Sequence, residues 1–129
     1  MITGQQPTKI FGHDSQLWAS AKEEARRILL GVAKASSLIE YGELARQMKN
    51  ISFDPHGYDF HSFLGELSSE SDATGAGIIT AVVVRQSDQT PGDGFFSLAK
   101  DLGRNVSNKE KCWADEVGRV YLAAKKQAA

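Results

Sequence analysis

The segment Asp54–His61 contains two Asp-x-His units five residues apart, and these are residue types that readily bind divalent metals. Imidazole nitrogens and carboxylate oxygens are ordinary ligands of zinc and related ions. His56 and Asp59 could converge across the turn between the units. If Asp59 begins a helix, however, Asp59 and His61 project about 200° apart and do not share one ion. The spacing favours helix-capping and surface positions and no metal site, with a metal-dependent hydrolase using His56, Asp59 and His61 as an alternative.

A glycine-rich turn, Pro91-Gly92-Asp93-Gly94, is a second candidate for ligand binding. Glycines let the backbone approach a ligand closely, and amides at the start of a following helix can bind an anion. The turn lacks the Lys-Ser/Thr pair of a phosphate-binding loop and the spacing of a dinucleotide site. Asp93 would also repel a phosphate. We therefore expect a structural turn that directs Phe95 and Phe96 into the core, and no cofactor.

Cys112 is the only cysteine in the 129 residues, so the chain can form no internal disulfide and no cysteine-based zinc cluster. It stands next to Trp113 within a helical pattern, with no neighbouring histidine to act as a base. We interpret it as a packed, inert side chain. No nucleophile–base pair, metal cluster or cofactor loop emerges from the sequence, which predicts that the protein is not an enzyme.

The elements that position these residues are mainly helical. Apolar residues at spacings of three and four predict helices over about 16–35, 41–49 and 59–69, and a last helix whose capping box is Ser107 with Glu110. The β-branched run Ile78–Arg85 predicts a buried strand paired with Leu38–Ile39 or with Phe95–Phe96. The segment Phe95–Leu102 can alternatively begin a helix. We expect a loosely ordered arm over 1–14, then a single α+β domain over 15–129, mostly helical, with a small sheet and a long C-terminal helix.

The run Ile39-Glu40-Tyr41-Gly42-Glu43-Leu44-Ala45 resembles the second helix of the winged-helix DNA-binding domain in alkylguanine-DNA alkyltransferases and their catalytically silent relatives. Glu40 replaces the capping hydroxyl of that pattern, whereas Glu43 keeps the second half of the capping box. The reactive Pro-Cys-His-Arg motif of the alkyltransferases has no counterpart. The resemblance implies a winged-helix-like unit with a helix-turn-helix at about 41–69, and it implies no alkyl transfer.

A second resemblance covers roughly residues 39–103. The apolar run Thr80–Val84 followed by a Pro-Gly-x-Gly-Phe-Phe turn, together with the Tyr-Gly-Glu-Leu-Ala run, is similar to a group of small uncharacterised bacterial proteins. This likeness implies a shared fold and brings no assigned activity. Its structural motif consists of Tyr41, Gly42, Glu43, Pro91, Gly92, Gly94 and Phe95.

Binding of DNA would use the third helix, which enters the major groove in such folds. Tyr58, His56 and His61 stand at the start of that helix. The residues available to contact phosphates are Arg46, Lys49, Arg85 and Arg104. Two carboxylates on the predicted exposed side, Glu66 and Glu70, argue against this function, because affinity for DNA depends largely on neutralised phosphates.

The charge distribution supports an alternative. The net charge is only −1, but residues 53–103 contain eight carboxylates and two basic residues. An acidic face that includes Asp59, Glu66 and Glu70 would suit a protein partner with a basic surface. The alternative to DNA binding is therefore a protein-interaction module of the immunity or anti-defence type.

Composition predicts a cytoplasmic protein. Apolar residues make up 41% of the chain, enough for a packed core, and the longest apolar run is far shorter than a membrane span of roughly 20 residues. The N-terminal residues lack the basic start and apolar stretch of a secretory signal. We expect a macromolecular partner, either DNA or protein, and no membrane association.

Overall fold

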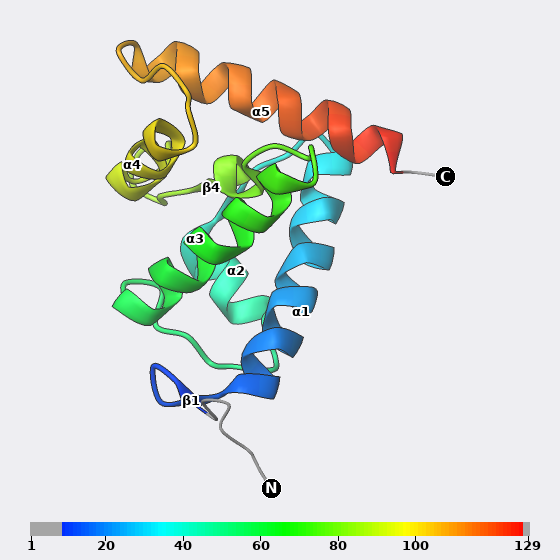
Figure 1. Ribbon diagram of the computed structural model, residues 1–129, viewed down its shortest axis with the longest axis vertical. Helices are drawn as coiled ribbons and strands as arrows, with labels where there is room; N and C mark the ends of the chain where they lie inside the picture. Colours follow the sequence, from blue (N-terminus) through cyan, green and yellow to red (C-terminus); the bar gives the residue numbers. More distant parts are fainter. Residues whose placement is uncertain (1–8, 128–129) are drawn as a thin grey trace, which may run out of the picture.

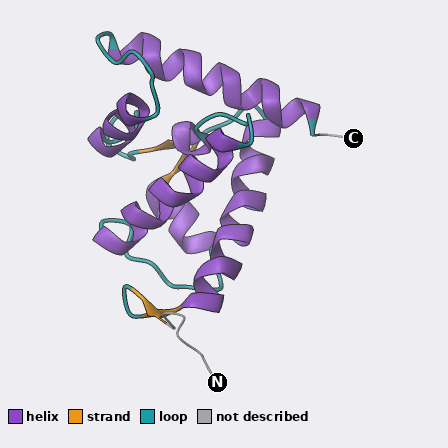
Figure 2. Ribbon diagram, viewed as in Figure 1, coloured by secondary structure: helices purple, strands orange, loops and turns teal. Residues whose placement is uncertain are grey.

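The computed structural model describes residues 9–127, and within them five α-helices surround a short apolar segment (Figure 1). The helices are α1 (Ser15–Lys34), α2 (Tyr41–Gln47), α3 (Tyr58–Ala73), α4 (Asp93–Asp101) and α5 (Lys109–Lys126). The strands are two residues each: β1 (Lys9–Ile10), β2 (His13–Asp14), β3 (Ile39–Glu40) and β4 (Val83–Val84). Figure 2 shows how little strand there is, and the predicted class, a mostly helical α+β fold, is confirmed.

Helix α1 forms where the apolar stripe predicts it. Its buried side is a row of small and large apolar residues, namely Trp18, Ala21, Ala25, Leu29 and Ala33. Asp14 caps the helix, because its Oδ1 accepts hydrogen bonds from the amides of Gln16 at 2.8 Å and Leu17 at 3.2 Å. The alanines let other elements approach α1 closely, and α3 and α5 both pack on it (Figure 1).

The run Ile78–Arg85 is not the continuous strand that its composition predicts. A 3-10 turn, η1 (Ile79–Val82), precedes the two-residue β4, and every residue from Ile78 to Val84 is buried. The segment contacts α1, α3 and α5 and pairs with a strand only over its last two residues. A continuous strand would leave its other backbone groups without partners in this helical surrounding.

Side chains supply those partners instead. Ile78 N–H donates to Glu116 Oε2 at 2.8 Å, Ile79 N–H to Ser71 Oγ at 3.1 Å, and Thr80 N–H to Ser68 Oγ at 3.2 Å. The indole N–H of Trp113 donates to the carbonyl of Ala81 at 2.8 Å. These long-range bonds favour the compact turn over an extended strand.

The sheet partner is the first of the two predicted ones. Ile39 pairs with Val83 and Glu40 with Val84 in a parallel ladder. Phe95 and Phe96 lie in α4, so the helical alternative for residues 95–102 is correct.

The N-terminal hairpin corrects the prediction of a loose arm for residues 9–14. Strands β1 and β2 pair antiparallel, with Lys9 opposite Asp14 and Ile10 opposite His13. The Nε2 of His13 lies 2.8 Å from Asp59 Oδ2, which attaches the hairpin to α3. The rest of the predicted arm, residues 1–8, lies outside the described residues.

The capping box predicted for the last helix is absent. The N-cap of α5 is Asn108, whose Oδ1 accepts from the Lys111 amide at 3.1 Å, so Ser107 does not cap the helix. Glu43 does not reach back to the start of α2 and instead contacts Arg46 and Gln47 in the same helix.

Over residues 9–127, no helix has the length and apolarity to cross a bilayer.

Candidate functional site

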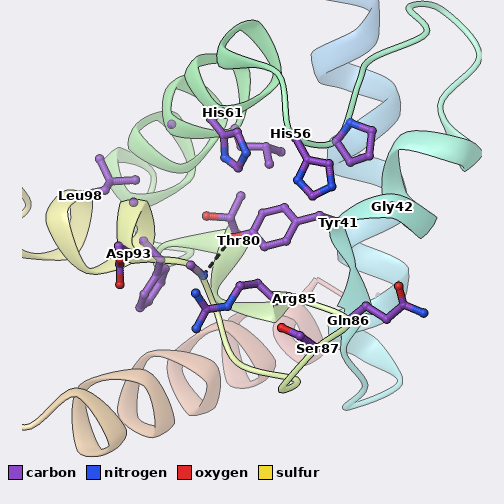
Figure 3. Close-up of a pocket in the computed structure, with 16 residues that line it drawn as sticks. Tyr41, Gly42, His56, His61, Thr80, Arg85, Gln86, Ser87, Asp93 and Leu98 are labelled. Atoms are coloured by element: carbon purple, nitrogen blue, oxygen red, sulfur yellow. Dashed lines mark hydrogen bonds between the residues drawn. The ribbon is translucent and has the colours of Figure 1, made fainter.

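A cavity of about 570 Å³ lies where the start of α2, the first turns of α3 and the start of α4 meet (Figure 3). Its lining is apolar at Leu64, Phe95 and Leu98, polar or positively charged at His56, His61 and Arg85, and negatively charged at Asp93. Figure 3 shows the rings of His56, His61 and Tyr41 turned toward the same space. The cavity is therefore formed from segments that are far apart in the sequence.

Tyr41 connects the two sequence motifs at the cavity. Its Oη accepts a hydrogen bond from the Gly92 amide at 3.3 Å, and its ring centroid lies 5.6 Å from that of His61. Burial raises the pKa of the Tyr41 phenol above its usual value, against the smaller opposing effects of the Gly92 amide and the Arg85 charge. The Tyr-Gly run and the Pro-Gly-x-Gly turn thus meet at one hydrogen bond.

Arg85 stands at the cavity within a small loop. Its Nη2 lies 2.8 Å from Asp88 Oδ2, and its Nε lies 3.3 Å from Asp88 Oδ1. Hydrogen bonds from Thr90, and to a smaller degree from Arg85, lower the pKa of Asp88. The pairing with Asp88 fixes the orientation of the guanidinium while leaving the side chain 44% exposed.

The carboxylates of α3 do not form a free acidic face. Glu66 Oε1 accepts from the indole N–H of Trp18 at 3.0 Å and lies 3.4 Å from Lys22 Nζ. Glu70 is paired with Lys22 Nζ at 2.6 Å and with Arg26 Nη2 at 3.1 Å. Both side chains therefore lie against the basic residues of α1.

The other two carboxylates of α3 are paired as well. Asp59 binds His13 and also accepts a hydrogen bond from the Phe60 amide at 2.9 Å. Asp72 Oδ1 lies 2.6 Å from Arg104 Nη2. All four carboxylates of α3 thus have a partner from another part of the fold.

Asp59 does not line the cavity with His56 and His61. Its contacts go to His13 and Phe60, whereas His56 and His61 border the cavity. Within residues 9–127, no three His, Cys, Asp or Glu side chains converge as a metal site requires. The set His56, Asp59 and His61 does not form one site.

Arg104 is the clearest misassignment among the predicted phosphate contacts. Its Nε and Nη2 bind the buried carboxylate of Glu116 at 2.9 and 3.0 Å, and Nη1 and Nη2 bind Asp72 at 3.3 and 2.6 Å. Nη1 also donates to the Leu102 carbonyl at 3.1 Å. These five bonds use the five N–H donors of a guanidinium. Arg104 therefore joins α3 to α5.

The remaining predicted cations lie on and after α2. Arg46 is 72% exposed and contacts Glu43 on the same helix. Lys49 is exposed in the loop that follows, where its backbone amide donates to Glu24 Oε2 at 2.8 Å. Neither residue lines the cavity, although α2 begins at it.

Cys112 is buried, as predicted. Burial, followed by the negative charge of Glu116, raises the pKa of its thiol. A raised pKa reduces the thiolate that a nucleophile requires.

Tyr58 does not line the cavity but stands 76% exposed at the first residue of α3. Its ring centroid lies 5.6 Å from that of Phe11, which is 51% exposed at the hairpin turn. Sequence reasoning missed Phe11, because the turn has no periodicity that would mark it.

The predicted site and motif residues that the structure brings together at the cavity are His56, His61, Arg85, Tyr41, Gly42, Gly92, Gly94 and Phe95.

Comparisons of the chain with protein-family models, curated proteins and solved structures find no match.

Proposed function

We propose that this chain is a non-enzymatic, cytoplasmic domain that binds DNA through the start of α3, the mouth of the cavity and the exposed cations on and after α2. The observation that carries the proposal is the pairing of all four α3 carboxylates with partners elsewhere in the fold. The strongest argument against DNA binding is that Glu66 and Glu70 would face the phosphates. Their pairing with Lys22 and Arg26 on α1 weakens that argument.

The start of α3 offers groups that suit nucleic acid. His56 and His61 border the cavity with ring nitrogens that can bond phosphate oxygens or base edges, and Arg85 lies across from them (Figure 3). Arg46 and Lys49 add exposed positive charge on and after α2. The resemblance of Tyr41–Ala45 to a winged-helix DNA-binding domain supports the same function.

The acidic protein-interaction module receives less support. That alternative requires exposed negative charge, and three of the residues that would supply it, Asp59, Glu66 and Glu70, are paired within the fold. A partner protein would have to compete with Lys22 and Arg26 for Glu70.

A salt-dependent titration with random duplex DNA tests the proposal. At roughly 50 mM salt the protein should bind, and its affinity should fall steeply as salt rises, because binding releases counterions from the phosphates. The double variant Arg46→Ala, Lys49→Ala should reduce the salt slope by about one for each phosphate that is no longer neutralised. The double variant His56→Ala, His61→Ala should weaken binding.

Lys111→Ala is the matched control. Lys111 is an exposed cation on α5, paired with Asp115, and it does not border the cavity described above. Its replacement changes the net charge by the same amount as Arg46→Ala without touching the proposed face. No binding at roughly 50 mM salt, or an equal effect of Lys111→Ala and Arg46→Ala, would contradict the proposal.

A further inference from the structure

Two aromatic side chains project together into solvent where the hairpin meets α3. Phe11 and Tyr58 are 51% and 76% exposed, and their rings meet edge to face with centroids 5.6 Å apart. Most large apolar side chains of this fold are buried, so an adjacent exposed pair requires an explanation.

The hairpin holds Phe11 in an unfavourable backbone conformation. Its φ is 51°, in the left-handed region, and Gly12 follows with φ of 82°. A bulky residue rarely adopts this conformation, because its Cβ crowds the backbone. The turn is kept in place from both sides: the ring of Phe11 lies 5.8 Å from that of buried Trp18, and His13 binds Asp59.

The pair adjoins the segment proposed above to bind DNA. Lys9 is exposed on β1 beside the turn, opposite Asp14 in the hairpin, and Asp59 is occupied by His13. His56, two residues before Tyr58 in the chain, lines the cavity, where the rings of His61 and Tyr41 have centroids 5.6 Å apart. The exposed pair is therefore close in sequence to a histidine that lines the cavity.

We infer that Phe11 and Tyr58 form a stacking platform for unpaired bases, and that the ligand of this face is single-stranded DNA in preference to duplex. This inference rests on the proposed function and specifies the form of DNA that is bound. An exposed ring can stack only on a base face that is free, and in a duplex both faces of an internal base are covered by its neighbours. Stacking tolerates every base, so little sequence preference is expected.

Fluorescence anisotropy with a short oligothymidylate and with a duplex of equal length tests the inference. Wild-type protein should bind the single strand more tightly at equal salt. Tyr58→Leu keeps an apolar side chain but removes the ring, and it should weaken single-strand binding between about 5-fold and about 150-fold. Tyr58→Phe keeps the ring and should bind like wild type.

A second readout reports stacking itself. Aminopurine, a fluorescent base analogue, is quenched when it stacks on an aromatic ring. Wild-type protein and Tyr58→Phe should quench aminopurine in a single strand, whereas Tyr58→Leu should not. Leu122→Ala is the control for loss of exposed apolar surface, because Leu122 is 59% exposed on α5.

The two proposals fail in different ways. Absence of binding to either form of DNA overturns both. Duplex binding equal to or tighter than single-strand binding, or wild-type behaviour of Tyr58→Leu, overturns the stacking platform and leaves DNA binding standing. The DNA affinity and the melting temperature of Phe11→Leu are both measured, because Phe11 also contacts Trp18. The variants of Tyr58 should fold normally, because Tyr58 is largely exposed.

Discussion

Glu116 on α5 and Arg104 in the preceding loop form a bidentate ion pair, with Nε 2.9 Å from Oε1 and Nη2 3.0 Å from Oε2. Glu116 is completely buried, and its Oε2 also accepts the Ile78 amide at 2.8 Å. The carboxylates of Glu116 and Asp72 raise the pKa of Arg104 further above its usual value. This pair therefore joins α5, α3 and the start of η1.

Replacing Glu116 by alanine should lower the free energy of unfolding by about 3–5 kcal/mol, because the buried part of the Arg104 charge and the Ile78 amide lose their acceptor. Urea denaturation measures the change. Asp115→Ala, which removes the exposed partner of Lys111 one residue away, should change stability by no more than about 1 kcal/mol. A loss for Glu116→Ala as small as that of the control would contradict the structural role of the pair.

Gly77 should tolerate alanine worse than Gly75 does. Both have positive φ, of 80° and 87°, so the left-handed conformation should lower the stability of both alanine variants by roughly 1–2 kcal/mol. A Cβ at Gly77 would lie 3.0 Å from Glu116 Oε2 and 3.3 Å from Val120 Cγ2, whereas one at Gly75 would meet nothing within 4 Å. Overpacking should therefore add about 1–3 kcal/mol at Gly77 alone, and equal losses in denaturant melts would show that this crowding relaxes freely.

The sequence predicts the amphipathic helices well, because their signal is local. The stripe from Trp18 to Ala33 needs only its own period to indicate α1. The run Ile78–Val84 misleads for the opposite reason. Its β-branched residues indicate a buried strand, but hydrogen bonds from its backbone amides to Ser68, Ser71 and Glu116, which no local pattern reveals, favour a 3-10 turn over its first half.

The candidate site could be predicted only in part. The resemblance motifs contain Tyr41 and Gly92, but nothing in the sequence indicates that they share a hydrogen bond. Helical spacing places Glu66 and Glu70 on one side of α3 without showing that α1 lies there. The sequence also assigns Arg104 to phosphates, since its burial against Glu116 depends on a contact between α5 and a loop.

Reversing the charge of Glu70 should destabilise the protein, and reversing Lys22 as well should restore part of the loss, because Arg26 and Glu66 remain beside the exchanged charges. Glu70→Lys places three cations together with Lys22 and Arg26, at a cost of about 1 kcal/mol. In the double variant Lys22→Glu, Glu70→Lys the two residues can again form an ion pair, with the positive and negative charges exchanged between α1 and α3. A double-mutant cycle in urea measures the coupling, and strictly additive effects would show that the pair is not formed in solution.

Stability should fall at alkaline pH in part through Tyr41. Burial raises the pKa of its phenol in the folded state above the unfolded value of about 10. Folding therefore favours the neutral form, so this contribution is complete below pH about 10 and is lost as pH rises through the higher folded pKa.

The difference between the ultraviolet phenolate titrations of wild type and Tyr41→Phe isolates this group. The phenolate signal missing from the variant should be centred above pH about 10, and a centre at or below that value would contradict the burial of Tyr41. Tyr121→Phe is a useful comparison, because burial also raises the pKa of Tyr121.

Filling the cavity from α3 should weaken DNA binding without harming the fold. Gly65 lines the cavity, and a Cβ there meets nothing within 4 Å. Gly65→Leu should raise helix stability by up to about 1 kcal/mol while occupying the space beside His61. Gly118→Ala, on α5 and equally unobstructed, should gain similar stability and bind DNA like wild type. Unchanged affinity in Gly65→Leu would remove the cavity from the binding face.

The parallel ladder between Ile39 and Val83 has a consequence for folding kinetics. Pairing of residues so far apart in the chain requires closure of a long loop, whose entropic cost is met only when the loop's own contacts have formed. Helices α2 and α3 lie entirely within that loop. The ladder should therefore form late, after α3 has packed on α1. Substitutions at Val83 should then mainly accelerate unfolding and leave the folding rate almost unchanged.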